Sequence, residues 1–400
     1  MRMRLFASTA IAIVLLTVAR ANASPPSPAP TRIQNQRGAI ISVEPLNVME
    51  LADLQRISAD FPGGITVQGG ARLFRIVYWT VLKGRPTRAS GLFATPLPTT
   101  PAKGILLFLH GTNATRALAP SQPGRVDGNE ETAVFAGNGF IVALPDYLGL
   151  GVSRVPHPYL IVQPQIDATV DLLRAIRQAE PSLRARFSID LFMMGFSEGG
   201  QVVAGVHRAL ERQPLAGYRL RGSVGIAGPY DLRDTSLPKA VENNCRLCVG
   251  YLTWATYAYA AYYGHPLREA LRPRYVGVVP GLFDGSHTAE EIGAALPDDP
   301  AAMFQPDFLR AMRTGRGNWF TQALARNETY AWTPVAPFRL YFGDRDTDVP
   351  PAAAGMFFDY AHARGGNISL HSLSGADHQA SSAMAYAPTL AWFNALAEQR

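Results

Sequence analysis

Cysteine is almost absent from this sequence: only two occur in 400 residues, Cys245 and Cys248. A fold held together by several disulfides is therefore excluded. The pair forms one Cys-x-x-Cys that lacks the partner ligands of a zinc site and lies away from any redox-type βαβ unit. We expect a local disulfide that closes one loop, with two free thiols as the alternative.

Charged residues are also scarce, at 17% of the chain, and they form no dense basic run. The formal net charge of +6 includes Arg2, Arg4 and Arg20, so it falls to about +3 if a leader carrying these three is removed. That charge distribution is not typical of a nucleic-acid-binding protein. No nucleic-acid partner is therefore predicted.

Long apolar runs are missing beyond the first residues, so no stable transmembrane anchor is expected. At the start, Arg2 and Arg4 precede a short apolar stretch over residues 5–19, and Ala23 ends an Ala-x-Ala cleavage site. This arrangement is typical of a secretory signal peptide over residues 1–23, with a membrane anchor as the alternative. We expect an exported protein, periplasmic or secreted.

Apolar residues are plentiful, at 47% of the chain, which is enough for a large buried core. Residues 24–40 begin with a Pro/Ser/Ala-rich stretch and are predicted to be a flexible mature N-terminus. Helical spacing of apolar side chains predicts a helix over 45–60. Residues 73–82 and 89–95 are dense in β-branched and aromatic side chains and predict an antiparallel pair that opens a sheet.

From residue 104 onward, apolar runs typical of buried strands alternate with helical patterns. Strands are predicted over 105–109, 140–144, 188–194, 221–227, 338–342 and 368–373. Helices are predicted over 130–136, 165–180, 199–212, 352–363 and 380–398. Such alternation favours an open, mostly parallel α/β sheet flanked by helices.

One segment interrupts this alternation. Residues 231–334 contain no strand-like run, but they contain helical patches, several prolines and an aromatic stretch over 251–263. We therefore predict a mainly helical cap or lid inserted at 231–334. The sheet domain would then consist of residues 41–230 and 335–400.

A glycine-rich motif follows the predicted strand at 188–194. Residues 195–199 fit Gly-x-Ser-x-Gly, in which the serine lies at the apex of a tight strand-to-helix turn and the glycines avoid side-chain clashes. Ser197 is the candidate nucleophile, and the N–H of Glu198 is a candidate donor to a developing oxyanion. The side chain of Glu198 is expected to be a bystander, with tuning of the site as the alternative.

A second motif, His110-Gly111-Thr112, follows the predicted strand at 105–109. Glycine there lets the backbone approach an acyl oxygen, so the N–H of Thr112 is the candidate second oxyanion donor. His110 is given a supporting role, the alternative being a packed structural histidine.

Three aspartates compete for the role of the acid that orients a catalytic imidazole. Asp346 lies three residues after Gly343 and three before Val349, a spacing that returns its carboxylate over the edge of the sheet. Asp346 is therefore predicted as the acid. Asp344 and Asp348 are expected to be solvated turn residues.

His378 is the candidate general base, because it closes the Gly-Ala-Asp-His motif after the last predicted strand. His371 is the main rival, but it lies inside that strand. The chain order Ser197, Asp346, His378 is the order that this architecture uses.

The motifs around Ser197, Asp346 and His378 resemble those of α/β-hydrolase fold serine hydrolases. Residues 145–151, with His-Pro-Tyr at 157–159, are similar to the bacterial relatives of the fungal secretory lipases. This resemblance implies the α/β-hydrolase fold and a carboxylic ester hydrolase, a serine esterase or lipase, with a cap over the acyl pocket. It implies an acyl-enzyme mechanism without a metal or an organic cofactor, on a small-molecule or lipid ester.

Aromatic side chains of the cap and of the loops at the strand ends are the candidates for the substrate pocket, although rings in the cap can equally pack it onto the sheet domain. The candidates are His110, Tyr147, His157, Tyr251, Trp254 and Tyr257. Two other classes stay open: a serine peptidase or aminopeptidase on the same fold, and a non-catalytic binding protein. Acyl length, interfacial activation and oligomeric state are left open as well.

Overall fold

The computed structural model describes residues 36–59, 61–98, 101–122, 129–181, 183, 187–242, 245 and 247–399. The predicted signal peptide over 1–23 lies outside these residues, as does most of the expected N-terminal segment 24–40. The last residues of that segment, 36–40, form a turn and the start of the first strand.

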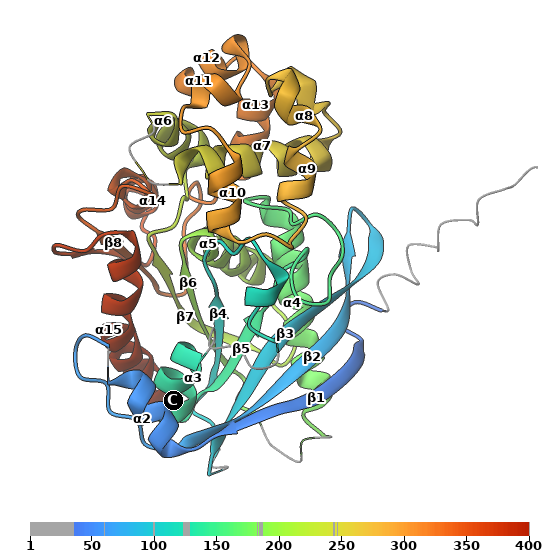
Figure 1. Ribbon diagram of the computed structural model, residues 1–400. Helices are drawn as coiled ribbons and strands as arrows, with labels where there is room; N and C mark the ends of the chain where they lie inside the picture. Colours follow the sequence, from blue (N-terminus) through green and yellow to red (C-terminus); the bar gives the residue numbers. More distant parts are fainter. Residues whose placement is uncertain are drawn as a thin grey trace, which may run out of the picture.

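A nine-stranded sheet crosses the molecule in the order β1-β2-β3-β5-β4-β6-β7-β8-β9 (Figure 1). Its first three strands are β1 (Ile40–Met49), β2 (Gly70–Leu82) and β3 (Arg85–Leu97). The remaining strands are β4 (Ile105–Leu109), β5 (Ile141–Pro145), β6 (Asp190–Phe196), β7 (Arg219–Ile226), β8 (Phe338–Gly343) and β9 (Ile368–Leu373). The pairs from β1 to β5 are antiparallel, and the pairs from β5 to β9 are parallel.

This topology confirms the predicted mostly parallel sheet with an antiparallel opening. The central strands are apolar throughout: all five residues of β4 and of β5, and all seven of β6, are buried. Strands covered by helices on both faces need such continuous apolar runs, which is why the sequence pattern located them well.

The predicted helix over 45–60 is wrong in its first part. Residues up to Met49 belong to β1, and the helix α2 covers only Leu51–Ser58. β1 is an edge strand paired with β2 alone, and its burial pattern is mostly intermediate or exposed. A half-exposed edge strand shows only weak alternation of apolar and polar residues. The helical spacing of the apolar residues in α2 was therefore assigned to residues before Leu51 as well.

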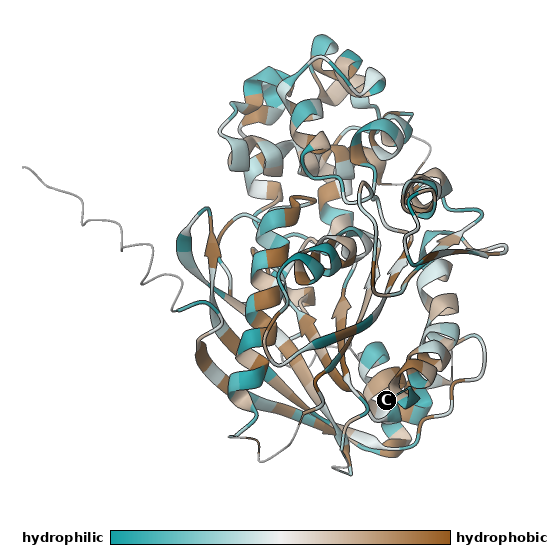
Figure 2. Ribbon diagram, turned by 180° about the vertical axis from the view of Figure 1, so that it is seen from behind, coloured by the Kyte–Doolittle hydropathy of each residue, from teal (hydrophilic) through white to brown (hydrophobic). Residues whose placement is uncertain are grey.

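Helices cover both faces of the sheet. On one face lie α4 (Val162–Ala179), α5 (Glu198–Arg212) and α14 (Pro351–His362), whose apolar residues share a core with one side of the strands. On the other face lie α2, α3 (Asn129–Phe135) and α15 (His378–Glu398). Figure 2 shows the consequence: the strands are mainly apolar, while the outward turns of the flanking helices are hydrophilic. Two short 3₁₀ turns, η1 (Arg116–Leu118) and η2 (Ala136–Asn138), lie in the connections.

The segment between β7 and β8 is helical and lies above the carboxyl ends of the parallel strands (Figure 1). Its longest helix is α7 (Cys248–Tyr263). The others are η3 (Leu232–Ser236), α6 (Leu237–Val241), η4 (Leu267–Glu269), α8 (Pro273–Val276), α9 (Val279–Leu282), α10 (Ala289–Ala295), α11 (Pro300–Met303), α12 (Pro306–Thr314) and α13 (Trp319–Ala325). Their apolar side chains form a third core, separate from the two cores of the sheet, to which Ala114, Tyr159 and Ile161 of the sheet domain also contribute. We call this segment the cap.

The predicted disulfide is present: Cys245 and Cys248 are joined at the start of α7, with an S–S distance of 2.03 Å. Among the described residues, no helix is long and apolar enough to cross a membrane.

Candidate active site

The turn between β6 and α5 has the backbone of a nucleophile elbow. Ser197 adopts φ 56° and ψ −120°, a conformation that non-glycine residues rarely adopt. A Cβ atom on Gly195 would lie 2.1 Å from the carbonyl oxygen of Gly199, and one on Gly199 would lie 1.8 Å from that of Leu109. Both positions therefore exclude any side chain, and this close backbone approach is the physical reason for the Gly-x-Ser-x-Gly spacing.

Asp346 and His378 lie beside this serine. His378 Nε2 is 2.9 Å from Ser197 Oγ, and His378 Nδ1 is 2.7 Å from Asp346 Oδ2. Because a carboxylate only accepts, Nδ1 donates to Asp346, which leaves Nε2 to accept the proton of the serine hydroxyl. All three residues are buried, between 6% and 9% exposed.

Each of the three residues follows a strand of the parallel part of the sheet. Ser197 comes after β6, Asp346 after β8, and His378 is the first residue of α15, after β9. Asp346 Oδ1 accepts from the backbone N–H groups of Asp348 and Val349, both at 2.9 Å, so its other oxygen is aimed at the imidazole. The predicted spacing before Val349 thus corresponds to a real turn.

The rival residues lie elsewhere. His371 is held within β9, where its ring stacks on Tyr341 and Nε2 is 2.9 Å from Ser369 Oγ. Asp344 is exposed and accepts from the backbone N–H of Gly375. Asp348 differs from the expectation of a solvated turn residue, because it is half-buried and burial raises its pKa.

The two candidate oxyanion donors lie next to Ser197. Glu198 is the first residue of α5, so its N–H has no carbonyl within the helix to bind. On the other side, a Cβ atom on Gly111 would lie 3.3 Å from the Cβ of Ser197, which brings the Gly111-Thr112 segment against the nucleophile. Both candidate donors therefore belong to segments that adjoin Ser197.

The side chain of Glu198, which was expected to be a bystander, is held by buried partners. It is 1% exposed, and one of its oxygens is hydrogen-bonded to His157 and to Gln165. The sequence offered no signal for this pairing, because His157 is 41 residues away along the chain.

Ser197 lines two of three neighbouring cavities, and Thr112 and Tyr251 line all three. A cleft of about 730 Å³ contains Ser197, His378 and His110 and is bordered by rings such as that of Phe61. The second cavity, of about 80 Å³, lies between Ser197 and the cap and is mainly apolar. Its walls include Leu237, Ala240, Leu252, Ala255, Phe320, Leu324 and Val349, together with Asp348.

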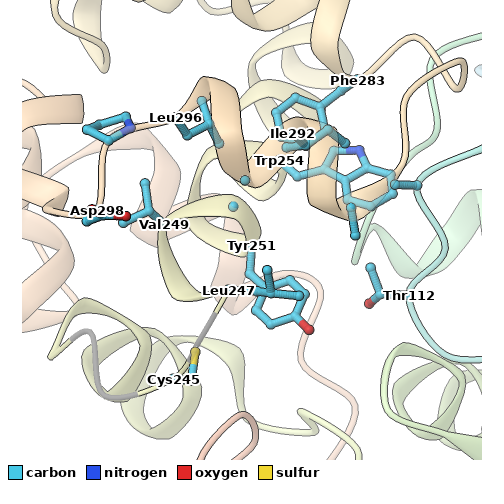
Figure 3. Close-up of a pocket in the computed structure, with 15 residues that line it drawn as sticks. Thr112, Cys245, Leu247, Val249, Tyr251, Trp254, Phe283, Ile292, Leu296 and Asp298 are labelled. Atoms are coloured by element: carbon cyan, nitrogen blue, oxygen red, sulfur yellow. The ribbon is translucent and has the colours of Figure 1, made fainter.

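The third cavity, of about 230 Å³, lies within the cap. Figure 3 shows its lining, with the rings of Trp254 and Phe283 together on one side and Val249 and Asp298 on the opposite side. Of the predicted pocket residues, His110, Tyr251 and Trp254 line these cavities. Tyr147, His157 and Tyr257 are not part of their walls.

One group of acids in the described part of the chain has the spacing of metal ligands: Asp231, Asp234 and Glu328, where the cap joins the sheet domain. Both carboxylate oxygens of Asp234 are hydrogen-bonded to the guanidinium of Arg233. Because this charge is already compensated and the group lines none of the cavities that contain Ser197, we assign it no metal.

The sheet order, the elbow after β6 and the inserted helical cap define the α/β-hydrolase fold. No protein-family model matches the sequence, and no curated protein matches it either. Solved structures do match. A Legionella pneumophila protein described as a hydrolase superposes with a TM-score of 0.85 at 26% identity, over 90% of this chain and 99% of that one.

Two further structures extend the comparison. The rice cell wall degrading esterase LipA from Xanthomonas oryzae matches with a TM-score of 0.78 at 26% identity, over 91% of this chain and 98% of the esterase. Candida antarctica lipase A in its closed state shares the fold, with a TM-score of 0.66 at 14% identity, over 94% of this chain and 88% of the lipase. The chain thus resembles esterases and lipases of the α/β-hydrolase fold, as its motifs indicated.

Proposed function

We propose that the protein is a serine hydrolase that cleaves carboxylic esters through Ser197, His378 and Asp346. The observation that carries this proposal is the unbroken hydrogen-bonded series from Asp346 through His378 to Ser197, whose last two members line two cavities. Similarity to an esterase and to other hydrolases at 26% identity supports ester cleavage.

The mechanism follows from the geometry. Ser197 Oγ attacks the ester carbonyl while His378 Nε2 takes its proton, and Asp346 stabilises the imidazolium that forms. The N–H groups of Thr112 and Glu198 bind the oxyanion, and the alcohol leaves with the proton from His378. Water, activated by the same imidazole, then releases the acid from the acyl-enzyme.

The cavities support a division of the substrate. The small apolar cavity beneath the cap suits the acyl chain, and the wide cleft on the other side of Ser197 suits the alcohol part. No metal or organic cofactor takes part in these steps. Export after removal of residues 1–23 belongs to the proposal, and the Cys245–Cys248 disulfide supports it.

Replacement of the nucleophile tests the proposal. Ser197→Ala should lower kcat for p-nitrophenyl esters by roughly 10⁴- to 10⁶-fold, because the attacking oxygen is lost, while the thermal unfolding midpoint stays close to that of the wild type. A fluorophosphonate probe should label the wild type and not this variant. Ser374→Ala, at an exposed position of the loop before His378, is the control. Unchanged turnover of the esters by Ser197→Ala would contradict the assignment of Ser197 as the nucleophile.

The peptidase alternative has its own test. A panel of p-nitrophenyl esters, triglycerides and aminoacyl anilides separates the classes, and cleavage of the anilides alone would replace ester hydrolysis as the function. If the protein hydrolyses none of these substrates and does not react with the fluorophosphonate probe, the non-catalytic binding protein is the correct alternative.

A further inference from the structure

The loop between β5 and α4, residues 146–161, contacts the segment that carries the first oxyanion donor. The hydroxyl of Tyr147 donates to the carbonyl oxygen of His110 at 3.1 Å. The hydroxyl of Thr112 donates to that of Tyr159, also at 3.1 Å. Both tyrosines are buried, so these contacts hold the backbone on either side of Gly111.

The same loop also contacts the second donor residue. His157 Nε2 is 3.0 Å from Glu198 Oε1, and the Nδ1 atom of the same ring is 2.7 Å from the carbonyl oxygen of Leu148. Gln165 Nε2 donates to the same carboxylate oxygen at 3.1 Å. His157 is 4% exposed and Glu198 1%, so water does not compensate the pair.

The hydrogen-bond partners of His157 determine where the protons lie. Nδ1 faces a carbonyl oxygen and therefore donates, while Nε2 faces a carboxylate oxygen at hydrogen-bond distance, so a second proton lies between His157 and Glu198. The pair is thus neutral as a unit. Among the described residues, His157 is the one basic side chain hydrogen-bonded to this carboxylate.

Three other titratable groups interact with Glu198, and none of them is stabilised as a cation. Burial lowers the pKa of His110 and raises the pKa of Tyr147 and of Tyr159 well above its ordinary value. None of them can therefore offset a negative charge on Glu198. That role falls to His157.

Glycines at two positions of the loop 146–161 allow its backbone to pack closely around His157 and Asp146. Gly149 has φ 88°, and a Cβ atom there would lie 2.5 Å from the backbone of His157. Gly151 has φ 54°, and a Cβ atom there would lie 2.2 Å from Asp146 Oδ2. Asp146 anchors the start of the loop through hydrogen bonds from Ser90 and Ser121. The glycines of the 145–151 motif thus allow His157 to reach the elbow.

We propose that His157 is a positioning residue for the reaction: it holds the side chain of Glu198 and neutralises its carboxylate, so that the Glu198 N–H binds the oxyanion without an opposing buried charge beside it. This inference rests on the proposed ester hydrolysis. An uncompensated carboxylate next to the oxyanion would destabilise the transition state more than the neutral substrate, so its effect belongs in kcat and not in KM.

A charge-reversal cycle tests the inference. His157→Gln keeps a donor near the position of Nε2 but removes the basic ring that shares a proton with Glu198, and should lower kcat for a p-nitrophenyl ester by roughly 10²-fold with KM little changed. Glu198→Gln removes the carboxylate charge but keeps the backbone N–H, so it should lower kcat about tenfold less than His157→Gln does. The double variant should recover about tenfold or more over His157→Gln, because it leaves no buried charge.

If His157 has a purely structural role, the kcat of the double variant should be no higher than that of His157→Gln. That result would overturn the inference. A loss of about 10²-fold in kcat for Glu198→Gln alone would also overturn it, and this measurement can be made even if His157→Gln does not fold. His371→Gln, in β9, is the matched control and should leave kcat unchanged. If the wild type itself fails to hydrolyse esters or to react with a fluorophosphonate, the proposed function fails, and the inference fails with it.

Discussion

At the scale of single residues, the site depends on strain that its neighbours make tolerable. The positive φ of Ser197 costs on the order of 1–3 kcal/mol in an L-residue. Two features hold the residue there: its N–H donates to the carbonyl oxygen of Ile226 at 2.9 Å, and glycine at 195 and 199 permits close backbone approaches that a Cβ atom would block. The hydroxyl is thereby held within reach of His378.

Asp346→Asn should abolish most of the activity through the tautomer of His378. The amide oxygen of an asparagine would take the place of Oδ1, which accepts two backbone N–H groups, so its NH₂ group would face the imidazole. Nδ1 must then accept, the proton moves to Nε2, and Nε2 can no longer take the proton of Ser197. We expect kcat to fall by about 10⁴-fold near pH 7.

The measurement is the steady-state hydrolysis of a p-nitrophenyl ester, with thermal unfolding as the check on folding. Asp359→Asn, at an exposed position of α14, is the matched control. Activity of Asp346→Asn within tenfold of the wild type would show that Asp346 does not orient the base.

At the scale of elements, the cap helices form the roof of the small apolar cavity. The α6 residue Ala240 and the α7 residues Leu252 and Ala255 line it together with Ser197. α7 has an apolar composition around its whole circumference and packs against α6 and α13 within the cap. Its residues Trp254 and Tyr259 also contact the loop before α4, so α7 faces the sheet domain. If this cavity holds the acyl group, we expect the cap residues that line it to limit the length of the acyl chain.

Ala240→Phe should shorten the range of acyl chains. The larger ring would occupy part of the cavity, so kcat/KM for hexanoate and octanoate esters should fall by roughly 10- to 100-fold, while acetate should change by less than about threefold. Ala294→Phe, at an exposed position of α10, is the control. An equal loss for every chain length would mean that this cavity does not hold the acyl group.

At the scale of the whole molecule, a cluster of charged side chains lies where the cap joins the sheet domain. Asp231 follows β7 at the entrance to the cap, and Glu328 lies where the chain returns. Burial, together with the charge of Asp231, raises the pKa of Glu328 to about 7, whereas Arg233 opposes this shift. The described structure thus keeps a carboxyl group at the base of the cap that prefers to be protonated.

Glu328→Gln should stabilise the protein at pH 8 but not at pH 4. Below the ordinary pKa of 4.5 the carboxyl group is protonated in both the folded and the unfolded chain; between there and about 7 only the unfolded chain releases the proton, so stability falls as pH rises. Glutamine removes this loss, worth on the order of 1 kcal/mol because the group is partly exposed.

Thermal unfolding across this pH range measures the effect. Glu290→Gln, exposed on the cap helix α10, should show no comparable change with pH. A difference between Glu328→Gln and the wild type that is the same at pH 4 and pH 8 would contradict the shifted pKa.

The sequence predicted correctly those elements whose residue pattern depends on their immediate neighbours along the chain. The central strands were located to within about two residues, because burial on both faces demands continuous apolar runs. The elbow was predicted from five residues, since its backbone tolerates only glycine at two of them. The edge strand β1 was missed because half-exposed pairing at the rim of a sheet leaves little trace in the sequence.

By itself, then, the sequence determined the strand–helix alternation, the position of the inserted cap and the candidate residues Ser197, Asp346 and His378, because each follows a strand in a recognisable turn. Only the tertiary structure decided which side chains meet. The His157–Glu198 pair and the half-buried position of Asp348 depend on segments that are distant along the chain and come together at one edge of the sheet. Burial and charge compensation are properties of that meeting, and no local pattern encodes them.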